Sequence, residues 1–122
     1  MEPSVVHTLE KIKQANITIH GIGDALKMAH RRQSSDEVIE KLQHHQAVGE
    51  AFGYYFDAQG HVVQKVKTIG LQLEDLESKE FIYAVAGGMS KGEAIKAYLS
   101  IAPKNTVLIT DEAAAKVILN KE

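Results

Sequence analysis

Residues 81–91, FIYAVAGGMSK, contain the pattern that decides the fold. The stretch begins with an unbroken apolar run that includes aromatic and β-branched residues, which indicates a buried strand. Two glycines follow, and Ser90 with Glu93 three residues later is the capping-box pattern of a helix start. A buried strand that passes through glycines into an amphipathic helix is typical of an α/β protein with a parallel sheet.

Two further stretches repeat this pattern on either side. Residues 17–23, ITIHGIG, predict a buried strand that ends in a glycine loop, and Asp24 begins a short helix after it. Residues 106–110, TVLIT, predict a third buried strand, and Asp111 begins the last helix. Because strands that alternate with helices are joined by right-handed crossovers into a parallel sheet, we expect a three-layer, Rossmann-like α/β fold.

The middle of the chain predicts a β-hairpin. Residues 47–56 form a strand-like run, residues 57–60 (DAQG) give a turn, and residues 62–66 return as a second strand. Three parallel strands alone make a narrow sheet with an apolar edge, and such edges are normally paired or covered. We therefore expect residues 1–122 to be a single, partial domain or to complete the sheet by self-association. The alternative is that the hairpin strands extend the same sheet.

Composition excludes several functional classes. The 122 residues carry a net charge of −2 and no basic stripe, so we expect no DNA-binding domain within them. The lack of cysteine excludes a disulfide framework, a thiolate metal site and a cysteine nucleophile. No apolar stretch approaches the roughly 20 residues that span a bilayer, and the first residues lack a signal-peptide pattern. We expect a cytoplasmic protein without a membrane partner.

The strongest candidate site is the loop after the 81–86 strand. Gly87 and Gly88 allow the backbone to approach a ligand closely, and Ser90 marks a helix N-terminus with unpaired N–H groups. Lys91 stands in the first helical turn, where acidic residues are usual, and a cation there suits an anionic ligand. The same residues also fit an ordinary strand-to-helix turn with a solvated lysine.

Three further groups are candidates for the same site. Gly21 and Gly23 follow the first strand, and the carboxyl ends of parallel strands meet at one edge of a sheet. Two arginines, Arg31 and Arg32, close the next helix and suit one small phosphate group, although the helix dipole favours arginine there without any ligand. Glu50 could accept hydrogen bonds from sugar hydroxyls, or it could simply be solvated.

Other chemistry finds no support in the sequence. His44 and His45 are adjacent on a helix and have no carboxylate at chelating spacing, so we expect no metal. No serine–histidine–aspartate or nucleophile-elbow pattern is present, and we assign no catalytic residue and no cofactor.

Several stretches resemble the C-terminal effector-binding domain of the SorC family of bacterial sugar-responsive regulators. The stretches that carry the resemblance are 16–23 (NITIHGIG), 51–56 (AFGYYF), 84–88 (AVAGG), 91–95 (KGEAI) and 107–114 (VLITDEAA). They keep the family's order over essentially the whole chain. Family members are considerably longer, with an N-terminal helix-turn-helix and another half of the effector domain.

The resemblance implies a fold related to glucosamine-6-phosphate deaminase and ribose-phosphate isomerase. It also implies a phosphorylated-sugar effector such as fructose 1,6-bisphosphate, which relieves repression by altering oligomer contacts on DNA. By position, Lys91 and Arg31 match phosphate-contacting residues, and Glu50 matches a residue that contacts sugar hydroxyls. Arg31 is chosen over Arg32 as the arginine that faces the ligand.

Three functions remain open at this point. The first is a phosphosugar-sensing domain of a repressor of glycolytic genes. The second is a phosphosugar isomerase or deaminase with Glu50 or Asp24 as general base, which is disfavoured because no paired carboxylates accompany the glycine loops. The third is a purely structural oligomerisation module.

Overall fold

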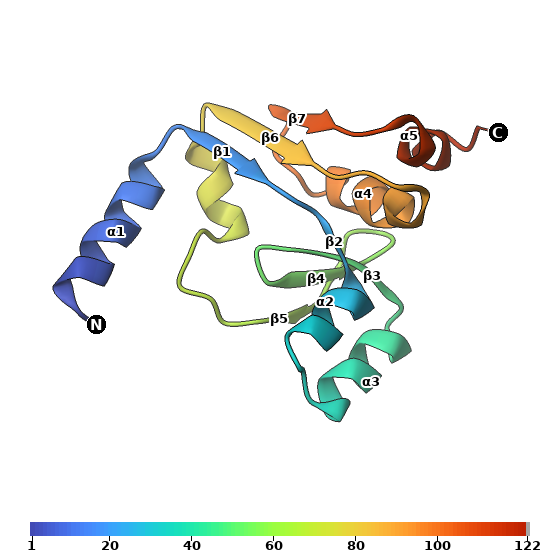
Figure 1. Ribbon diagram of the computed structural model, residues 1–122, viewed down its shortest axis with the longest axis horizontal. Coiled ribbons are helices and arrows are strands. Elements are labelled where there is room, and N and C mark those ends of the chain that lie inside the picture. Colours follow the sequence, from blue (N-terminus) through green and yellow to red (C-terminus); the bar gives the residue numbers. More distant parts are fainter. Residues whose placement is uncertain (122) are drawn as a thin grey trace.

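The computed structural model describes residues 1–121, which form two β-sheets with helices between and beside them (Figure 1). In chain order the elements are α1 (Pro3–Gln14), β1 (Ile17–His20), β2 (Gly23–Asp24), α2 (Ala25–Arg31), α3 (Asp36–His44), β3 (Ala47–Ala51), β4 (Tyr54–Asp57), β5 (Val62–Lys65), the 3₁₀ helix η1 (Leu73–Ser78), β6 (Phe81–Val85), the 3₁₀ turn η2 (Met89–Lys91), α4 (Gly92–Leu99), β7 (Thr106–Ile109) and α5 (Glu112–Ile118).

The first sheet is parallel and has the strand order β1-β6-β7. Ile17 pairs with Phe81, and Ile82 pairs with Thr106, so all three strands point the same way. The prediction of three parallel strands joined through helices is confirmed. The molecule is therefore a mixed α/β structure whose parallel strands all end at the same edge.

The second sheet is antiparallel and has the order β2-β3-β4-β5. The predicted strand over residues 47–56 is wrong as a single element, because the chain reverses at Phe52 and Gly53. Both residues have positive φ angles, 55° and 84°, which two-residue hairpin turns of the primed type require. The expected pairing of the following strand with 62–66 does form, as β4 with β5. These strands make a sheet of their own and do not extend the parallel one.

Helix α4 joins the two sheets. It lies between them (Figure 1), and its buried residues Ile95 and Tyr98 pack in one core with Ala84 of β6 and Phe56 of β4. Gly49 of β3 allows the close approach, because a Cβ there would lie 3.0 Å from the Ala94 methyl group. Helices α2 and α3 form a second core with Tyr55 of β4. Because both sheets pack against α4, this helix fixes the position of the parallel strand ends relative to the antiparallel sheet.

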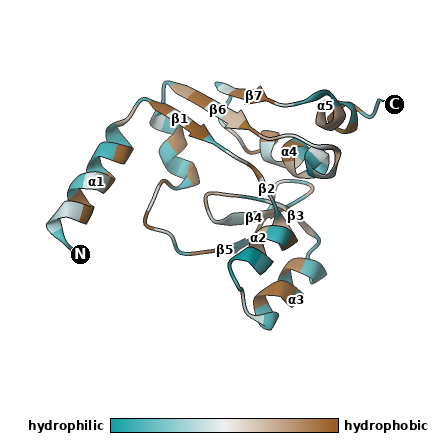
Figure 2. Cartoon of the chain, in the orientation of Figure 1, coloured by the Kyte–Doolittle hydropathy of each residue, from teal (hydrophilic) through white to brown (hydrophobic). Residues whose placement is uncertain are grey.

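One face of the parallel sheet is open in the described residues, so the expected third layer is not formed. Alternate side chains point inward, such as Thr18 and Ile82, whereas their neighbours face outward with large exposed fractions, such as 71% for Ile19 and 50% for Ile109. Figure 2 shows that β1 and β6 are mostly hydrophobic, so the open face of the sheet is apolar. The third layer is absent because α4 and α5, the helices after β6 and β7, pack on the same side of the sheet.

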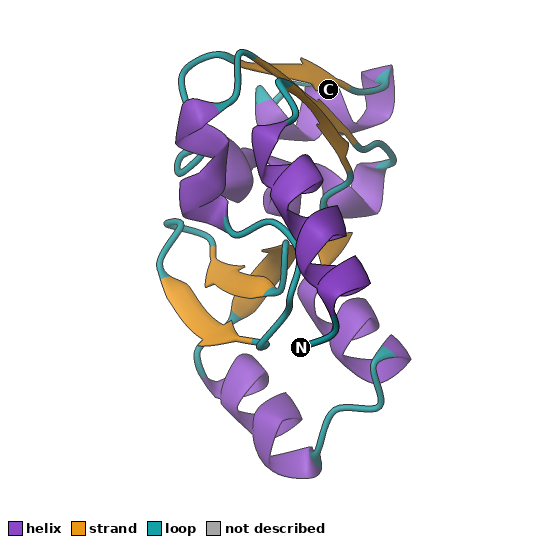
Figure 3. Ribbon diagram, turned by 90° about the vertical axis from the view of Figure 1, so that its left-hand side faces the viewer, coloured by secondary structure: helices purple, strands orange, loops and turns teal. Residues whose placement is uncertain are grey.

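Helix α1 stands apart at the left of Figure 1 and lies in front of the other elements in Figure 3, and it has no buried residue. Its C-terminal end is held by Lys79, whose ammonium group donates to the carbonyl oxygens of Ile12 (3.0 Å), Lys13 (2.6 Å) and Ala15 (2.6 Å). Lys79 is only 3% exposed. A cation at this end of a helix interacts favourably with the helix dipole and satisfies carbonyls that lack a partner within the helix.

Of the three helix starts predicted above, two are right. Asp24 and Asp111 accept hydrogen bonds from Lys27 N–H and Ala114 N–H, as expected of N-caps. Helix α3 is capped by Ser35, whose hydroxyl accepts a hydrogen bond from Val38 N–H. The capping box of Ser90 with Glu93 does not form, because a 3₁₀ turn inserts before α4 and moves the helix start to Gly92.

Candidate functional site

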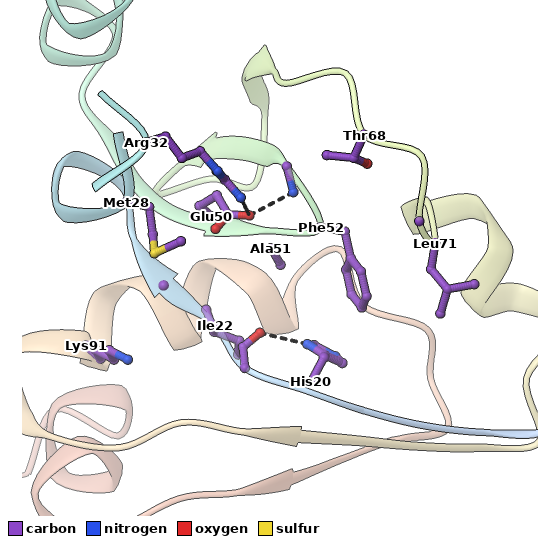
Figure 4. A pocket seen from close by; sticks show the side chains of 14 residues that line it. His20, Ile22, Met28, Arg32, Glu50, Ala51, Phe52, Thr68, Leu71 and Lys91 are labelled. Atoms are coloured by element: carbon purple, nitrogen blue, oxygen red, sulfur yellow. Dashed lines mark hydrogen bonds and ion pairs between the residues drawn. The ribbon is translucent and has the colours of Figure 1, made fainter. Parts of the chain in front are cut away.

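A cleft opens where the carboxyl ends of β1 and β6 face the antiparallel sheet (Figure 4). Its volume is about 510 Å³, within the usual range for small-molecule pockets. The lining comes from residues 20–23, from Met28 and Arg32 at α2, from residues 50–53, from Thr68, Gly70 and Leu71, and from Lys91. Parallel α/β sheets bind ligands at this edge of the strands, because the loops there are free to diverge.

Glu50 is the buried polar group of the cleft. It is 5% exposed, and its Oε2 atom accepts a hydrogen bond from Gly53 N–H at 2.8 Å. The Nη2 atom of Arg32 lies 3.5 Å from the same oxygen, and Arg32 Nη1 donates to the Tyr55 hydroxyl at 2.9 Å. The carboxylate therefore ties the hairpin turn to the end of α2, and it holds the guanidinium over the cleft.

Arg32 remains charged in this setting. Partial burial alone would lower the pKa of its guanidinium, but the hydrogen bond to Tyr55 and the charge of Glu50 together raise that pKa above its ordinary value. An arginine offers five N–H donors in a planar fork. Its contacts with Glu50 and Tyr55 leave donors that a ligand oxygen could use.

An aromatic cluster forms the floor at one end of the cleft. The ring of His20 lies 4.6 Å from the ring of Phe52 and 5.3 Å from that of Tyr98, measured between centroids. Phe52 occupies a positive-φ position in the hairpin turn, a conformation that is uncommon for large residues. The turn thereby presents an apolar ring next to the polar Glu50, a mixture that suits a sugar, which has C–H faces and hydroxyl edges.

The tautomer of His20 follows from its neighbours. Its Nδ1 atom lies 2.8 Å from the carbonyl oxygen of Gly21, which can only accept, so Nδ1 carries the proton. Nε2 then accepts from the Tyr98 hydroxyl at 3.3 Å. Burial lowers the pKa of His20 and outweighs the opposing effect of the Gly21 bond, and burial raises the pKa of Tyr98 to about 12. Both groups are therefore neutral near pH 7.

Lys91 supplies the second cation of the cleft. It ends η2 and precedes α4, which brings its side chain to the lining. In the described part of the chain no carboxylate forms an ion pair with it. Lys91 is thus available to an anionic ligand, whereas Arg32 is already engaged with Glu50.

The glycine loop before Lys91 is not part of the cleft lining. Gly88 N–H donates to Asp111 Oδ2 at 2.8 Å, and the other oxygen of Asp111 caps α5. A Cβ on Gly87 would lie 2.6 Å from the same carboxylate. Gly87, Gly88 and Ser90, the predicted anion cradle, therefore lie outside the cleft lining, and the Gly88 amide is bonded to the Asp111 carboxylate.

The structure brings Arg32, and not Arg31, to the cleft. Arg31 is the last residue of α2 and is exposed. Successive helical residues point about 100° apart, so only one of two adjacent arginines can face a given side. The expectation that Arg31 is the one facing the cleft is corrected on this geometric ground.

Four predicted residues, Gly21, Gly23, Glu50 and Lys91, line one cleft. Sequence reasoning did not single out His20 or Phe52. The signal for His20 was its place at the end of a buried strand, directly before the glycines. Phe52 stands before Gly53, a position that marks a two-residue turn once the strands on both sides are known.

The described residues contain no group of three or more histidine, cysteine, aspartate or glutamate side chains that could hold a metal ion. None of the described helices is long and apolar enough to cross a bilayer.

Residues 1–120 match the model of a protein family described as “Putative sugar-binding domain”. The chain is 52% identical to the central glycolytic genes regulator of Priestia megaterium and 53% identical to that of Bacillus subtilis, over 97% and 99% of its length. It covers 34% and 35% of those regulators, so it spans about a third of the curated relatives.

The crystal structure of a SorC family transcriptional regulator from Enterococcus faecalis is similar throughout. The TM-score is 0.94 at 50% sequence identity, over 98% of this chain and 48% of the other. The matched relatives are transcriptional regulators, so the prediction that the chain is not an enzyme is confirmed, and the isomerase or deaminase alternative is set aside. The chain belongs to the sugar-binding domain family of SorC-type transcriptional regulators.

Proposed function

We propose that the chain is the effector-binding part of a cytoplasmic regulator of glycolytic genes and that its cleft takes a phosphorylated sugar. Fructose 1,6-bisphosphate is the first candidate. The observation that carries the proposal is the meeting of Arg32, Lys91 and the buried Glu50 in one cleft of about 510 Å³. Two cations suit phosphate oxygens, and a carboxylate suits the hydroxyl groups between them.

The two cations would act differently. Lys91, which has no partner carboxylate among the described residues, would contribute most to the binding energy, since a hydrogen bond to a charged group contributes about 1.5–3 kcal/mol. Arg32 is held by Glu50 and Tyr55, so it would mainly fix the ligand's orientation. Arg31, at the exposed end of α2, would contribute only if the end of the helix rearranged on binding.

The open sheet face supports a second part of the proposal, namely that the chain is a partial domain. Ile17, Ile19 and Phe81 are 58%, 71% and 46% exposed on that face. Apolar patches of this kind mark interaction sites, because water leaves them favourably on contact. We propose that further chain or self-association as a dimer or higher oligomer covers this face, and that DNA is bound only through a separate domain. Sedimentation velocity tests the self-association.

We also propose that the complete domain has the Rossmann-like arrangement of the glucosamine-6-phosphate deaminase group. The parallel order β1-β6-β7 and a cleft at the carboxyl ends of the strands support this relation. A covered second face would supply the missing layer.

Calorimetric titration of fructose 1,6-bisphosphate tests the binding proposal. We expect Lys91→Ala to weaken binding at least about tenfold, the equivalent of about 1.4 kcal/mol. Lys104→Ala is the matched control, since this exposed lysine lies in the turn before β7, outside the cleft lining. We expect Arg32→Ala to weaken binding more than Arg31→Ala.

The titration also has a clear negative outcome. If Lys91→Ala bound the bisphosphate as tightly as Lys104→Ala does, Lys91 would not contact phosphate and the proposed cleft would be wrong. Unphosphorylated fructose, titrated in parallel, separates recognition of the phosphates from recognition of the sugar. Equal affinity for fructose and its bisphosphate would contradict the phosphosugar assignment.

A further inference from the structure

Residues 66–72 form the outer wall of the cleft and have no helical or strand structure. Thr68, Gly70 and Leu71 face the cleft from this segment, opposite residues 50–53 (Figure 4). The segment is anchored at its start, where Val66 N–H donates to the carbonyl oxygen of Gly53 at 2.8 Å. Among the described residues, no backbone hydrogen bond holds residues 67–71. Something other than backbone pairing must therefore keep this wall in place.

The side chain of Gln72 provides the missing contacts. Its Nε2 amide donates to the carbonyl oxygen of Thr68 at 3.2 Å, to the Thr68 hydroxyl at 3.2 Å and to the carbonyl oxygen of Gly70 at 3.1 Å. Gln72 itself is not part of the cleft lining. The side chain of Gln72 therefore bonds to both Thr68 and Gly70, two of the residues that face the cleft.

Gln72 is in turn fixed from its other side. Its backbone N–H donates to Asp75 Oδ2 at 2.8 Å, and its Oε1 atom lies 3.4 Å from the Tyr54 hydroxyl, whose single proton is shared with Glu74 Oε2 at 3.0 Å. Because the carbonyl oxygens of Thr68 and Gly70 can only accept, the NH₂ group of the amide must point to the wall and the oxygen to Tyr54. Tyr54 begins the strand directly after the Phe52–Gly53 turn, so Gln72 connects the two walls of the cleft.

We propose that Gln72 is a positioning residue, which fixes the outer wall of the cleft in the shape that retains the ligand. This inference rests on the proposed function of the cleft. A wall without backbone hydrogen bonds loses conformational freedom when it closes on a ligand, and that loss weakens binding. Gln72 orders the wall before the ligand arrives, so its loss should appear mainly as faster dissociation.

Gln72→Glu is the sharpest variant, because it keeps the size of the side chain and replaces the donating NH₂ group by an acceptor. One carboxylate oxygen would then face the carbonyl oxygens of Thr68 and Gly70. Gln64→Glu is the matched control. It adds the same negative charge, but Gln64 lies on β5 outside the cleft lining and accepts a single side-chain bond, from Lys41 Nζ at 2.9 Å. Any general repulsion of an anionic ligand is therefore present in both variants.

The first measurement needs no ligand. Backbone ¹⁵N relaxation of the free chain should give lower order parameters for residues 67–71 in Gln72→Glu than in the wild type. The amides of β3 and β4 should be unchanged. If the order parameters of residues 67–71 were the same in both proteins, Gln72 would not hold the wall and the inference would be wrong.

The second measurement is the dissociation rate of fructose 1,6-bisphosphate. We expect Gln72→Glu to raise it about tenfold, as for the loss of one to two neutral hydrogen bonds, and Gln64→Glu to leave it unchanged. Tyr54→Phe should raise it less, because the Tyr54 hydroxyl is closer to Glu74 Oε2 (3.0 Å) than to Gln72 Oε1 (3.4 Å). A dissociation rate unaffected by Gln72→Glu would overturn the inference. If the wild type bound no bisphosphate, the proposed function would fail, and relaxation alone would decide the role of Gln72.

Discussion

The two glycine loops of this chain look alike in sequence but differ in what they offer a ligand. The first loop, residues 20–24, begins at the last residue of β1, and its Gly21 and Gly23 line the cleft. Residues 86–90 follow β6, and there the Asp111 carboxylate accepts from Gly88 N–H and packs against Gly87. The loop after β6, which has the stronger sequence pattern for anion binding, is therefore the one whose Gly88 amide is already bonded.

The difference shows that glycines let a ligand approach the backbone of a loop, but they do not ensure that the loop's N–H groups are free to bind it. An anion at Gly88 would have to displace a carboxylate that also caps α5, so it would compete with two hydrogen bonds of the folded chain. At the first loop, Asp24 accepts only from Lys27 N–H of its own helix and takes nothing from the glycines. Whether a loop amide is open to a ligand is decided here by Asp111, which follows the neighbouring strand β7 and does not show in the loop's own sequence.

The largest expected effect concerns the backbone of the two loops. Gly88 has φ 98° and ψ 143°, a region that is essentially restricted to glycine, although a Cβ there would meet no atom within 4 Å. We expect Gly88→Ala to lower the free energy of unfolding by about 2–3 kcal/mol through conformational strain alone.

Gly21→Ala is the matched variant in the other loop. Its Cβ would lie an ordinary 3.8 Å from the carbonyl oxygen of Val85, and no strained φ is involved. We expect a change of about 0.5 kcal/mol or less. Urea unfolding of both variants measures the difference, and equal destabilisation would show that the two loops do not differ in backbone strain.

The next effect concerns the two aspartates that follow glycine loops. Asp111→Ala removes a helix cap and the bond to Gly88, so we expect a loss of about 2 kcal/mol. Asp24→Ala removes only a cap, with an expected loss of about 1 kcal/mol. Thermal or urea unfolding provides the values.

Asp111→Asn refines this comparison, because asparagine also caps helices well but presents a single acceptor oxygen. It should lie between the wild type and Asp111→Ala in stability. An Asp111→Ala variant no less stable than Asp24→Ala would mean that the bond to Gly88 contributes nothing, and the glycine loop would then count as free.

The fold was predictable where apolar runs identify strands, and less so where layers are concerned. Residues 81–85 are apolar on both faces of the sheet, and residues 17–19 are β-branched, which correctly indicated parallel strands. The same pattern suggested cover on both faces, whereas Ile19 is 71% exposed here. An apolar run records that a face is suited to burial, and it does not tell which segment buries it.

The candidate site was predictable in part for a similar reason. Glu50 and Lys91 were found because their types and positions stood out locally, and they meet in one cleft. Arg32 was a candidate, but Arg31 was preferred to it, since the choice depends on helix phase and on Tyr55, which is 23 residues away. Contacts between distant residues leave no local pattern, so a single sequence cannot rank two adjacent arginines.

The smallest expected effect is a pH dependence that belongs to the first loop. His20 contacts Phe52, the Tyr98 hydroxyl and the Gly21 carbonyl, and burial lowers its pKa below the ordinary value of 6.5. The unfolded chain then binds the proton more tightly than the folded one. Stability should therefore fall as the pH drops through 6.5 towards the folded-state pKa and change no further below it.

His20→Gln isolates this contribution, because the other five histidines are common to both proteins. The difference in unfolding free energy between wild type and variant should shrink as the pH falls from 7.5 to 5. A difference that stayed constant over this range would mean that His20 titrates normally in the folded chain. In that case the floor of the cleft would be open to water, and the first loop would be as solvated as a simple turn.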